Sequence, residues 1–177
     1  MKPIQPFVIP QFEKLWANYP VGPAEDVKTS IGGEINLPWL TNTCVVRVSR
    51  AFNYSGQKIP KDFQGLETIE GGDGLRYAFR VDEFEYFMDK RFGNALIDVN
   101  KERFTDSIKD SLGRLKGVIM FRVAGWSDAT GHMDLWNGEE CATESYFDKA
   151  NAIKLWVSPH DYNFEGVTGK RIRFHRD

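Results

Sequence analysis

Residues 42–49 of the chain read Asn42-Thr43-Cys44-Val45-Val46-Arg47-Val48-Ser49. The apolar positions of the wider segment 37–53 fit one helical stripe, although the β-branched run after the cysteine is also typical of a strand. We interpret the segment as a helix with Cys44 near its start. A thiol at a helix N-terminus lies near the positive end of the helix dipole and near free backbone N–H groups, and both favour the thiolate. The stretch therefore predicts a reactive cysteine.

A second segment supplies a partner for this thiol. Residues 131–138, Gly-His-Met-Asp-Leu-Trp-Asn-Gly, predict a short strand that carries His132, and the only other histidines of the chain are His160 and His175. Nucleophilic cysteine chemistry of the papain type requires a base beside the thiol, with the cysteine first in the chain and the histidine far downstream. Cys44 and His132 meet this order, and the pair predicts acyl-transfer chemistry.

A third group should orient the imidazole. Asp134 lies two residues beyond His132 and so on the same face of the strand. Such positions are about 7 Å apart along the backbone, which makes a direct hydrogen bond awkward. Asn137 and Glu144 are therefore alternatives to Asp134.

Composition limits the other classes of function. The chain has 177 residues, enough for one domain with a sizeable core, and its formal charge of −2 gives no footprint for nucleic acid. No window reaches the roughly 18 apolar residues of a membrane span, and no signal peptide opens the sequence, so we expect synthesis in the cytoplasm. No ligand spacing for a metal and no cofactor motif is found. Cys141 follows Glu139-Glu140, whose charges disfavour a thiolate, and is interpreted as structural or as half of a disulfide.

The remaining pattern predicts an α+β fold, with helices packed on a late antiparallel sheet. No linker or repeat divides residues 1–177, which we interpret as a single domain. Residues 20–33 are expected to be a loop and residues 71–74 (Gly-Gly-Asp-Gly) a turn. Helices are expected at 10–19, at 82–88 with an end near Gly93, and in the amphipathic segment 106–115. Strands are expected at 77–80, 117–124, 131–136 and 153–157.

The two motifs at 42–49 and 131–138, in this order and spacing, resemble the type VI secretion amidase effectors of family 4. These are antibacterial peptidoglycan hydrolases with an NlpC/P60-like, papain-like fold. The resemblance implies a D,L-endopeptidase that cuts the γ-D-glutamyl–meso-diaminopimelate amide bond of the stem peptide, without a cofactor. It also implies delivery by the type VI machinery to the periplasm of a target bacterium, and a cognate immunity protein that blocks the active site.

The resemblance implies roles for individual residues. Cys44 matches the nucleophile and His132 the general base, while the backbone N–H of Cys44 belongs to the oxyanion hole. Relatives carry their acid at the position of Thr143, next to Glu144, so Asp134 or Glu144 is expected to substitute for it. Cys141 has no nearby cysteine, so the disulfide that some relatives form after the histidine strand is absent here. Three tryptophans near the motifs line the groove or belong to the core: Trp39, Trp126 and Trp136.

Two other functions fit the same residues. The Cys–His pair also serves transglutaminases, acyltransferases and protein deamidases, because a fold does not determine a substrate. In a non-catalytic cell-wall or partner-binding module, Cys44 would simply be a small buried residue.

Overall fold

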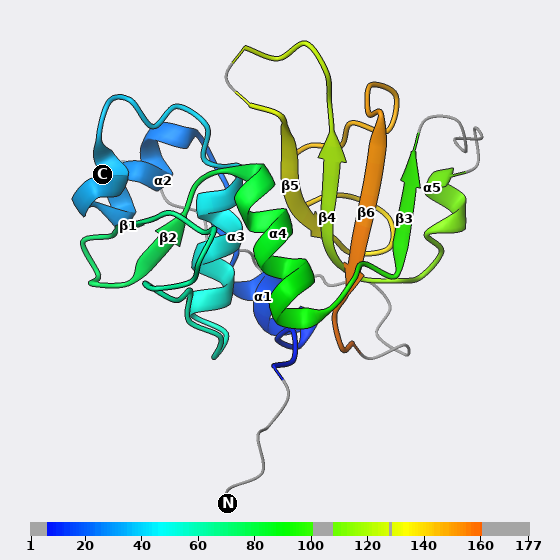
Figure 1. Cartoon of the computed structure of the whole chain (residues 1–177), viewed down its shortest axis with the longest axis horizontal. Coiled ribbons are helices and arrows are strands. Elements are labelled where there is room, and N and C mark those ends of the chain that lie inside the picture. Colours follow the sequence, from blue (N-terminus) through cyan, green and yellow to red (C-terminus); the bar gives the residue numbers. More distant parts are fainter. Residues whose placement is uncertain (1–6, 101–107, 128, 161–177) are drawn as a thin grey trace, which may run out of the picture.

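The computed structural model describes residues 7–100, 108–127 and 129–160. Figure 1 shows a mainly helical part beside a four-stranded sheet, with α3 and α4 next to the sheet. The helices are α1 (Phe12–Asn18), α2 (Ala24–Ile31), the 3-10 helix η1 (Gly33–Asn36), α3 (Cys44–Asn53), α4 (Val81–Phe92) and the short α5 (Ile108–Ser111). The α+β expectation is confirmed.

The sheet is antiparallel with the strand order β3-β6-β4-β5. Its strands are β3 (Ile97–Asn100), β4 (Gly117–Arg122), β5 (Gly131–Trp136) and β6 (Ala152–Val157). All six residues of β5 are buried, although it is an end strand, because α3 packs against it. A separate hairpin joins β1 (Thr68–Glu70) to β2 (Arg76–Ala78) around the expected turn at 71–74.

Helix α3 is the centre of the molecule. Every one of its residues is buried, and it contacts α1, β2 and β5. Val45, Val48 and Phe52 belong to the main hydrophobic core, whereas Val46 on the opposite side belongs to a smaller core shared with α2 and β2. Burial on all sides explains why the β-branched run at 45–48 still forms a helix, since packing outweighs the small propensity penalty. The predicted cysteine helix is confirmed.

The sequence-based expectations hold for the late strands and for α4, which ends at Gly93 with a φ of +91°. The loop expected over residues 20–33 is wrong, because residues 24–31 form α2. Pro23 is its N-cap, and Glu25 and Asp26 in the first turn suit the helix dipole. Strand β3 was not expected either. Of the amphipathic segment 106–115, residues 106 and 107 lie outside the described residues, and residues 108–111 are helical.

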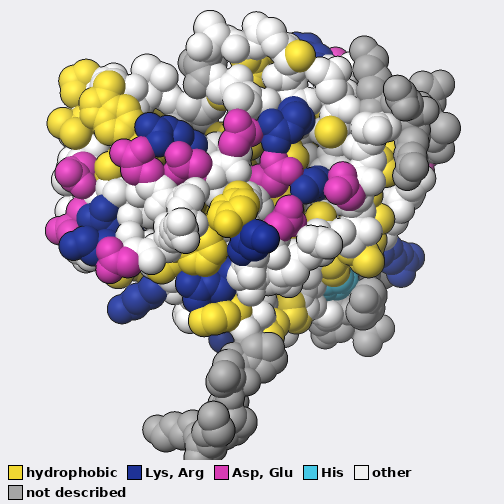
Figure 2. Space-filling view, viewed as in Figure 1, with side chains coloured by type: hydrophobic (Ala, Val, Ile, Leu, Met, Phe, Trp, Pro, Cys, Tyr) yellow, Lys and Arg dark blue, Asp and Glu magenta, His cyan; other side chains and the backbone are white. Residues whose placement is uncertain are grey.

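Charged pairs join α4 to the sheet. Arg122 at the end of β4 pairs with Asp82 (2.8 Å) and with Glu85, and Lys154 of β6 pairs with Glu85 (2.8 Å) and Asp89 (3.1 Å). Figure 2 shows the resulting band of acidic and basic side chains across this face of the molecule. Because one face of α4 presents carboxylates to cations on two strands, the start of α4 is fixed relative to the end of β4. No helix in the described ranges is long and apolar enough to cross a membrane.

Candidate active site

The packing of α3 on β5 brings Cys44 and His132 together. Cys44 is the first residue of α3 and is 5% exposed, and His132 is the second residue of β5 and is 9% exposed. Both side chains line the same cleft, and the interaction of the imidazole with the Cys44 side chain raises the pKa of His132. Nε2 of His132 binds Asp134, so Nδ1 is the ring nitrogen left for the thiol. Two motifs far apart in the sequence thus form one contact.

His132 and Asp134 contact each other directly. Nε2 of the imidazole lies 2.9 Å from Oδ2 of the carboxylate. The expectation that this bond would be awkward is wrong, because it considered the backbone separation alone. Both side chains leave the same face of β5, and an imidazole and a carboxylate together are long enough to span the gap.

Asp134 is completely buried and accepts several hydrogen bonds. Oδ1 accepts the backbone N–H of Leu135 (2.7 Å). Oδ2 accepts the hydroxyl of Thr143 (2.6 Å) and the backbone N–H groups of Thr143 and Glu144 (3.1 Å each). These donors come from both the strand itself and the loop that follows it, and together they restrain the carboxylate. The charge beside the imidazole is therefore held in a fixed position.

The two alternative third residues point to other partners. Oδ1 of Asn137 accepts the backbone N–H groups of Glu139 and Glu140, and the carboxylate of Glu144 accepts the hydroxyl of Tyr146. Asp134 is thus the one of the three candidates whose bond to His132 the structure shows. Thr143, the position at which the family resemblance implies an acid, instead donates to Asp134.

The surroundings of His132 favour the charged imidazolium. Burial lowers the pKa of His132, but the hydrogen bonds to Asp134 and Cys44, together with the charges of both partners, outweigh burial and raise it to about 10. The ring lies between aromatic neighbours: Phe121 is stacked at 6.5 Å between ring centroids, and Tyr146 meets it edge-on at 5.1 Å. These aromatic neighbours cover part of the ring, and a hydrogen bond is electrostatically stronger where less water surrounds it.

This pKa predicts how stability depends on pH. The pKa of His132 is raised from 6.5 to about 10 in the folded protein, so its contribution to the free energy of unfolding is complete below pH 6.5 and disappears as the pH rises to about 10. We expect the stability advantage of the wild type over His132→Gln to shrink across this window. Urea unfolding of both proteins at pH values below, within and above the window measures it. An advantage that stays constant would contradict the assignment.

The backbone N–H of Cys44, the expected oxyanion donor, already has a partner. It donates to Oδ1 of Asn42 at 2.9 Å. The amide oxygen of Asn42 thus occupies the place that a substrate oxygen needs if it is to reach this N–H. The sequence shows the asparagine but not this contact, which depends on the turn that leads into α3.

An open cleft of about 550 Å³ surrounds the pair. Cys44, Asn42 and His132 line it together with Arg47 of α3, and Pro23 and Ala24 at the start of α2. The cleft is also lined by Trp126, Thr143, Glu144 and Tyr146. Of the three tryptophans, Trp126 thus lines the groove and Trp136 is fully buried in the core, whereas Trp39 is 54% exposed.

Cys141 is a poor candidate for a nucleophile. Its thiol is buried and free, and burial together with the charges of Asp134 and Glu140 raises its pKa far above the usual range. His160 binds the backbone oxygen of Ser158 at the end of β6, and His175 lies outside the described residues. Within the described part of the chain, no three His, Cys, Asp or Glu side chains gather as a metal site would require.

The chain is similar to a known protein family and to solved structures. The model of the family described as "Type VI secretion system (T6SS), amidase effector protein 4" (Tae4) matches residues 40–156, which include the helix of Cys44 and the strand of His132. No curated protein matches the chain.

Three crystal structures show the same fold. Tae4 from Enterobacter cloacae is 28% identical with a TM-score of 0.77, and the match covers 87% of this chain and 99% of that one. The Tae4–Tai4 effector–immunity complex from Enterobacter cloacae gives 28% identity, a TM-score of 0.75, and coverage of 85% and 99%. The corresponding complex from Salmonella Typhimurium is 25% identical with a TM-score of 0.74, and the match covers 85% of this chain and 99% of that one.

Proposed function

The chain belongs to the type VI secretion system amidase effector protein 4 family, and from this premise we propose that it is a cysteine peptidoglycan D,L-endopeptidase. It hydrolyses the γ-D-glutamyl–meso-diaminopimelate amide bond of the stem peptide, and one catalytic domain performs the reaction. The observation that carries the proposal is the line of contacts from Cys44 through His132 to Asp134 in an open cleft. The α+β fold, with a cysteine helix packed on an antiparallel sheet, is of the papain-like NlpC/P60 type.

In the first step the Cys44 thiolate attacks the carbonyl carbon of the scissile amide and forms a tetrahedral intermediate. The imidazolium of His132 then gives its Nδ1 proton to the departing diaminopimelate nitrogen, and the C–N bond breaks to leave a thioester. The raised pKa of His132 supports this role, because the ring is charged and can donate a proton at neutral pH.

In the second step His132 removes a proton from water, the hydroxide attacks the thioester, and the thiolate of Cys44 leaves. Asp134 holds the ring through Nε2, so that Nδ1 faces the sulfur in both steps. The side chain of Asn42 must rotate away from the N–H of Cys44 before that donor can stabilise the oxyanion. One such donor typically lowers the activation barrier by about 3 kcal/mol.

We extend the proposal to delivery and inhibition. The chain is made in the cytoplasm, exported by the type VI machinery and active in the periplasm of the target bacterium. The similar effectors from Enterobacter cloacae and Salmonella Typhimurium form complexes with the immunity protein Tai4. We infer a cognate immunity protein for this chain, which blocks access to the cleft around Cys44.

Product analysis tests the proposed reaction. Purified diaminopimelate-type sacculi are digested with the protein, and the released fragments are identified by mass spectrometry. We expect a new amino terminus on diaminopimelate and a free γ-carboxyl on D-glutamate. Intact sacculi, or cleavage at a different bond, would contradict the proposal, and a transferred acyl group in place of hydrolysis would identify an acyltransferase.

A further inference from the structure

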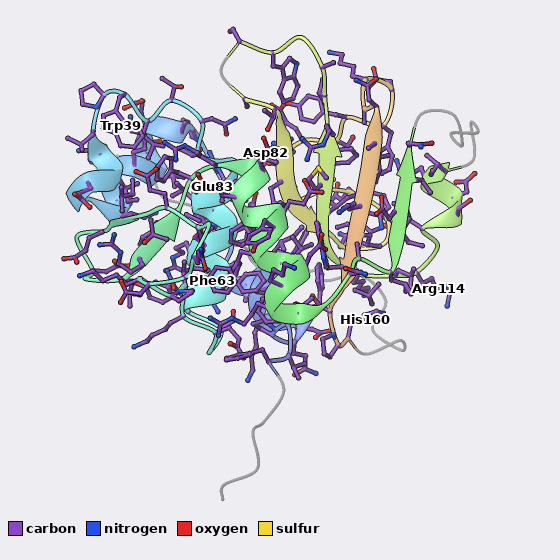
Figure 3. All side chains as sticks on the ribbon, viewed as in Figure 1. Trp39, Phe63, Asp82, Glu83, Arg114 and His160 are labelled. Carbon is purple, nitrogen blue, oxygen red and sulfur yellow. The ribbon has the colours of Figure 1, made fainter. Side chains whose placement is uncertain are left out.

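A second hollow adjoins the cleft on the side of α4. It has a volume of about 470 Å³ and is lined by Phe79, Arg80, Asp82 and Glu83, and it shares Asn42 and Trp126 with the cleft around Cys44. Figure 3 shows Asp82 and Glu83 at the start of α4, and Trp39 farther to the left in the helical part of the molecule. An elongated substrate that lies over Asn42 therefore reaches both hollows.

Asn42 marks the position of the scissile bond. Its Oδ1 accepts the N–H of Cys44, the donor that a substrate carbonyl oxygen would use during attack by the sulfur. Since Asn42 lines both hollows, a carbonyl at that place lies at their junction. The acyl part of the substrate then extends into one hollow and the amine part into the other.

The charge of the cleft around Cys44 suits the acyl part. Arg47 is only 7% exposed, and its guanidinium donates to the backbone oxygens of Pro20 and Gly22 and to the hydroxyl of Thr43. No carboxylate of the described residues forms an ion pair with it. The positive charge therefore attracts a substrate anion, and D-glutamate in γ-linkage carries its free α-carboxylate beside the bond that is cut. The carboxylate of Glu144, which also lines this cleft, accepts the hydroxyl of Tyr146.

The second hollow carries charges of both signs. Arg80 pairs with Glu67 and with Glu83 (2.9 Å), and both pairs use Nη1, so the guanidinium has further donors at Nε and Nη2. Asp82 accepts Arg122 and Thr130 (2.9 Å), both through Oδ1. A hollow with a cation and carboxylates at its wall fits a ligand group that is itself both anionic and cationic.

Aromatic side chains hold the cation in place. The guanidinium of Arg80 lies 4.8 Å from the centroid of the Phe79 ring. Trp39 packs against the same ring in an edge-to-face arrangement, with 5.3 Å between the two ring centroids. Phe79 and Trp126 also give the second hollow apolar walls, which suit a short hydrocarbon chain. The exposed Trp39 is thereby explained as support for the rim of this hollow.

We propose that the second hollow binds the distal end of the diaminopimelate residue, with Arg80 on its carboxylate and Glu83 and Asp82 on its ammonium group. The inference rests on the proposed function. It adds that the cleft around Cys44 and the second hollow, which differ in charge, fix the direction in which the stem peptide binds. Diaminopimelate is the residue of this substrate that carries both charges on a side chain. Lysine at the same position would keep the ammonium group and lack the carboxylate.

Two synthetic tetrapeptides test the assignment: L-Ala-γ-D-Glu-meso-diaminopimelyl-D-Ala and the same peptide with L-Lys. We expect Arg80→Gln to lower kcat/KM for the diaminopimelate peptide about tenfold, equivalent to about 1.4 kcal/mol, and to leave the lysine peptide unchanged. Glu83→Gln should lower kcat/KM for both peptides, because both keep the ammonium group. Arg114→Gln, an exposed arginine on the far side of the sheet, is the matched control.

The outcomes separate the two proposals. A wild-type protein that cleaves neither peptide overturns the proposed function and the subsite with it. The subsite alone is overturned if the wild type cleaves the diaminopimelate peptide but Arg80→Gln has the same ratio of kcat/KM values for the two peptides as the wild type. An equal loss on both peptides in Arg80→Gln also overturns it, because misfolding or a general effect would then explain the loss.

Discussion

Replacing Cys44 by alanine should lower the rate of peptidoglycan hydrolysis by roughly four to six orders of magnitude, because the variant has no nucleophile to form the thioester. The side chain is small and nearly buried, so the free energy of unfolding should change by no more than about 1 kcal/mol. Release of soluble fragments from sacculi measures the first effect, and urea unfolding measures the second.

Cys141 provides the matched control for Cys44. Both thiols are buried and free, but burial and nearby carboxylates keep the Cys141 thiol protonated, whereas Cys44 faces an imidazolium. Cys141→Ala should retain full hydrolysis, and iodoacetamide at neutral pH should label Cys44 rather than Cys141. A folded protein whose Cys44 resists alkylation while Cys44→Ala remains active would support the non-catalytic alternative.

Replacing Asp134 by alanine should damage both stability and activity. The change removes a fully buried carboxylate and leaves the imidazolium and the N–H groups of Leu135, Thr143 and Glu144 without their acceptor. Loss of one partner of a buried ion pair typically costs about 3–5 kcal/mol. Loss of the group that orients the ring should lower kcat by roughly 10³–10⁴-fold.

The two effects of the Asp134 change are measured separately. Chemical unfolding gives the stability loss, and kcat is determined at a temperature at which the variant is still folded. Asp148→Ala, an exposed aspartate in the loop that follows β5, should leave both quantities unchanged. If Asp134→Ala were as active as the wild type while folded, Asp134 would have no part in orienting His132.

Much of the fold was readable from the sequence because its signals are local. The helix over 44–53 and the strands at 117–122 and 131–136 each show a clear apolar pattern within a few residues. Helix α2 was missed because Pro23 was interpreted as part of a loop, although proline followed by acids is also a helix start. Strand β3 is not evident from the sequence because it is an edge strand that pairs with β6, and a segment of four residues is too short to show a clear alternation of apolar and polar residues.

The site was predictable to the extent that its residues stand out chemically. Cysteine and histidine are rare in this chain, Cys44 stands at the start of a helix and His132 on a strand, and Asp134 shares a strand face with the histidine. The roles of Thr143 and Asn42 could not be predicted. Thr143 reaches Asp134 only because the chain turns back after β5, where Cys141 pairs with Trp136. The bond of Asn42 depends on the turn before α3.

The anchoring of Asp134 has a consequence for how such a chain can diverge. Three of its donors are main-chain N–H groups, which every residue except proline possesses. The residues at positions 143 and 144 can therefore exchange most of their side chains and still fix the carboxylate. The exposed loop beside the cleft can thus change its side chains without displacing the carboxylate of Asp134. Such changes would alter the surface that a binding partner contacts there.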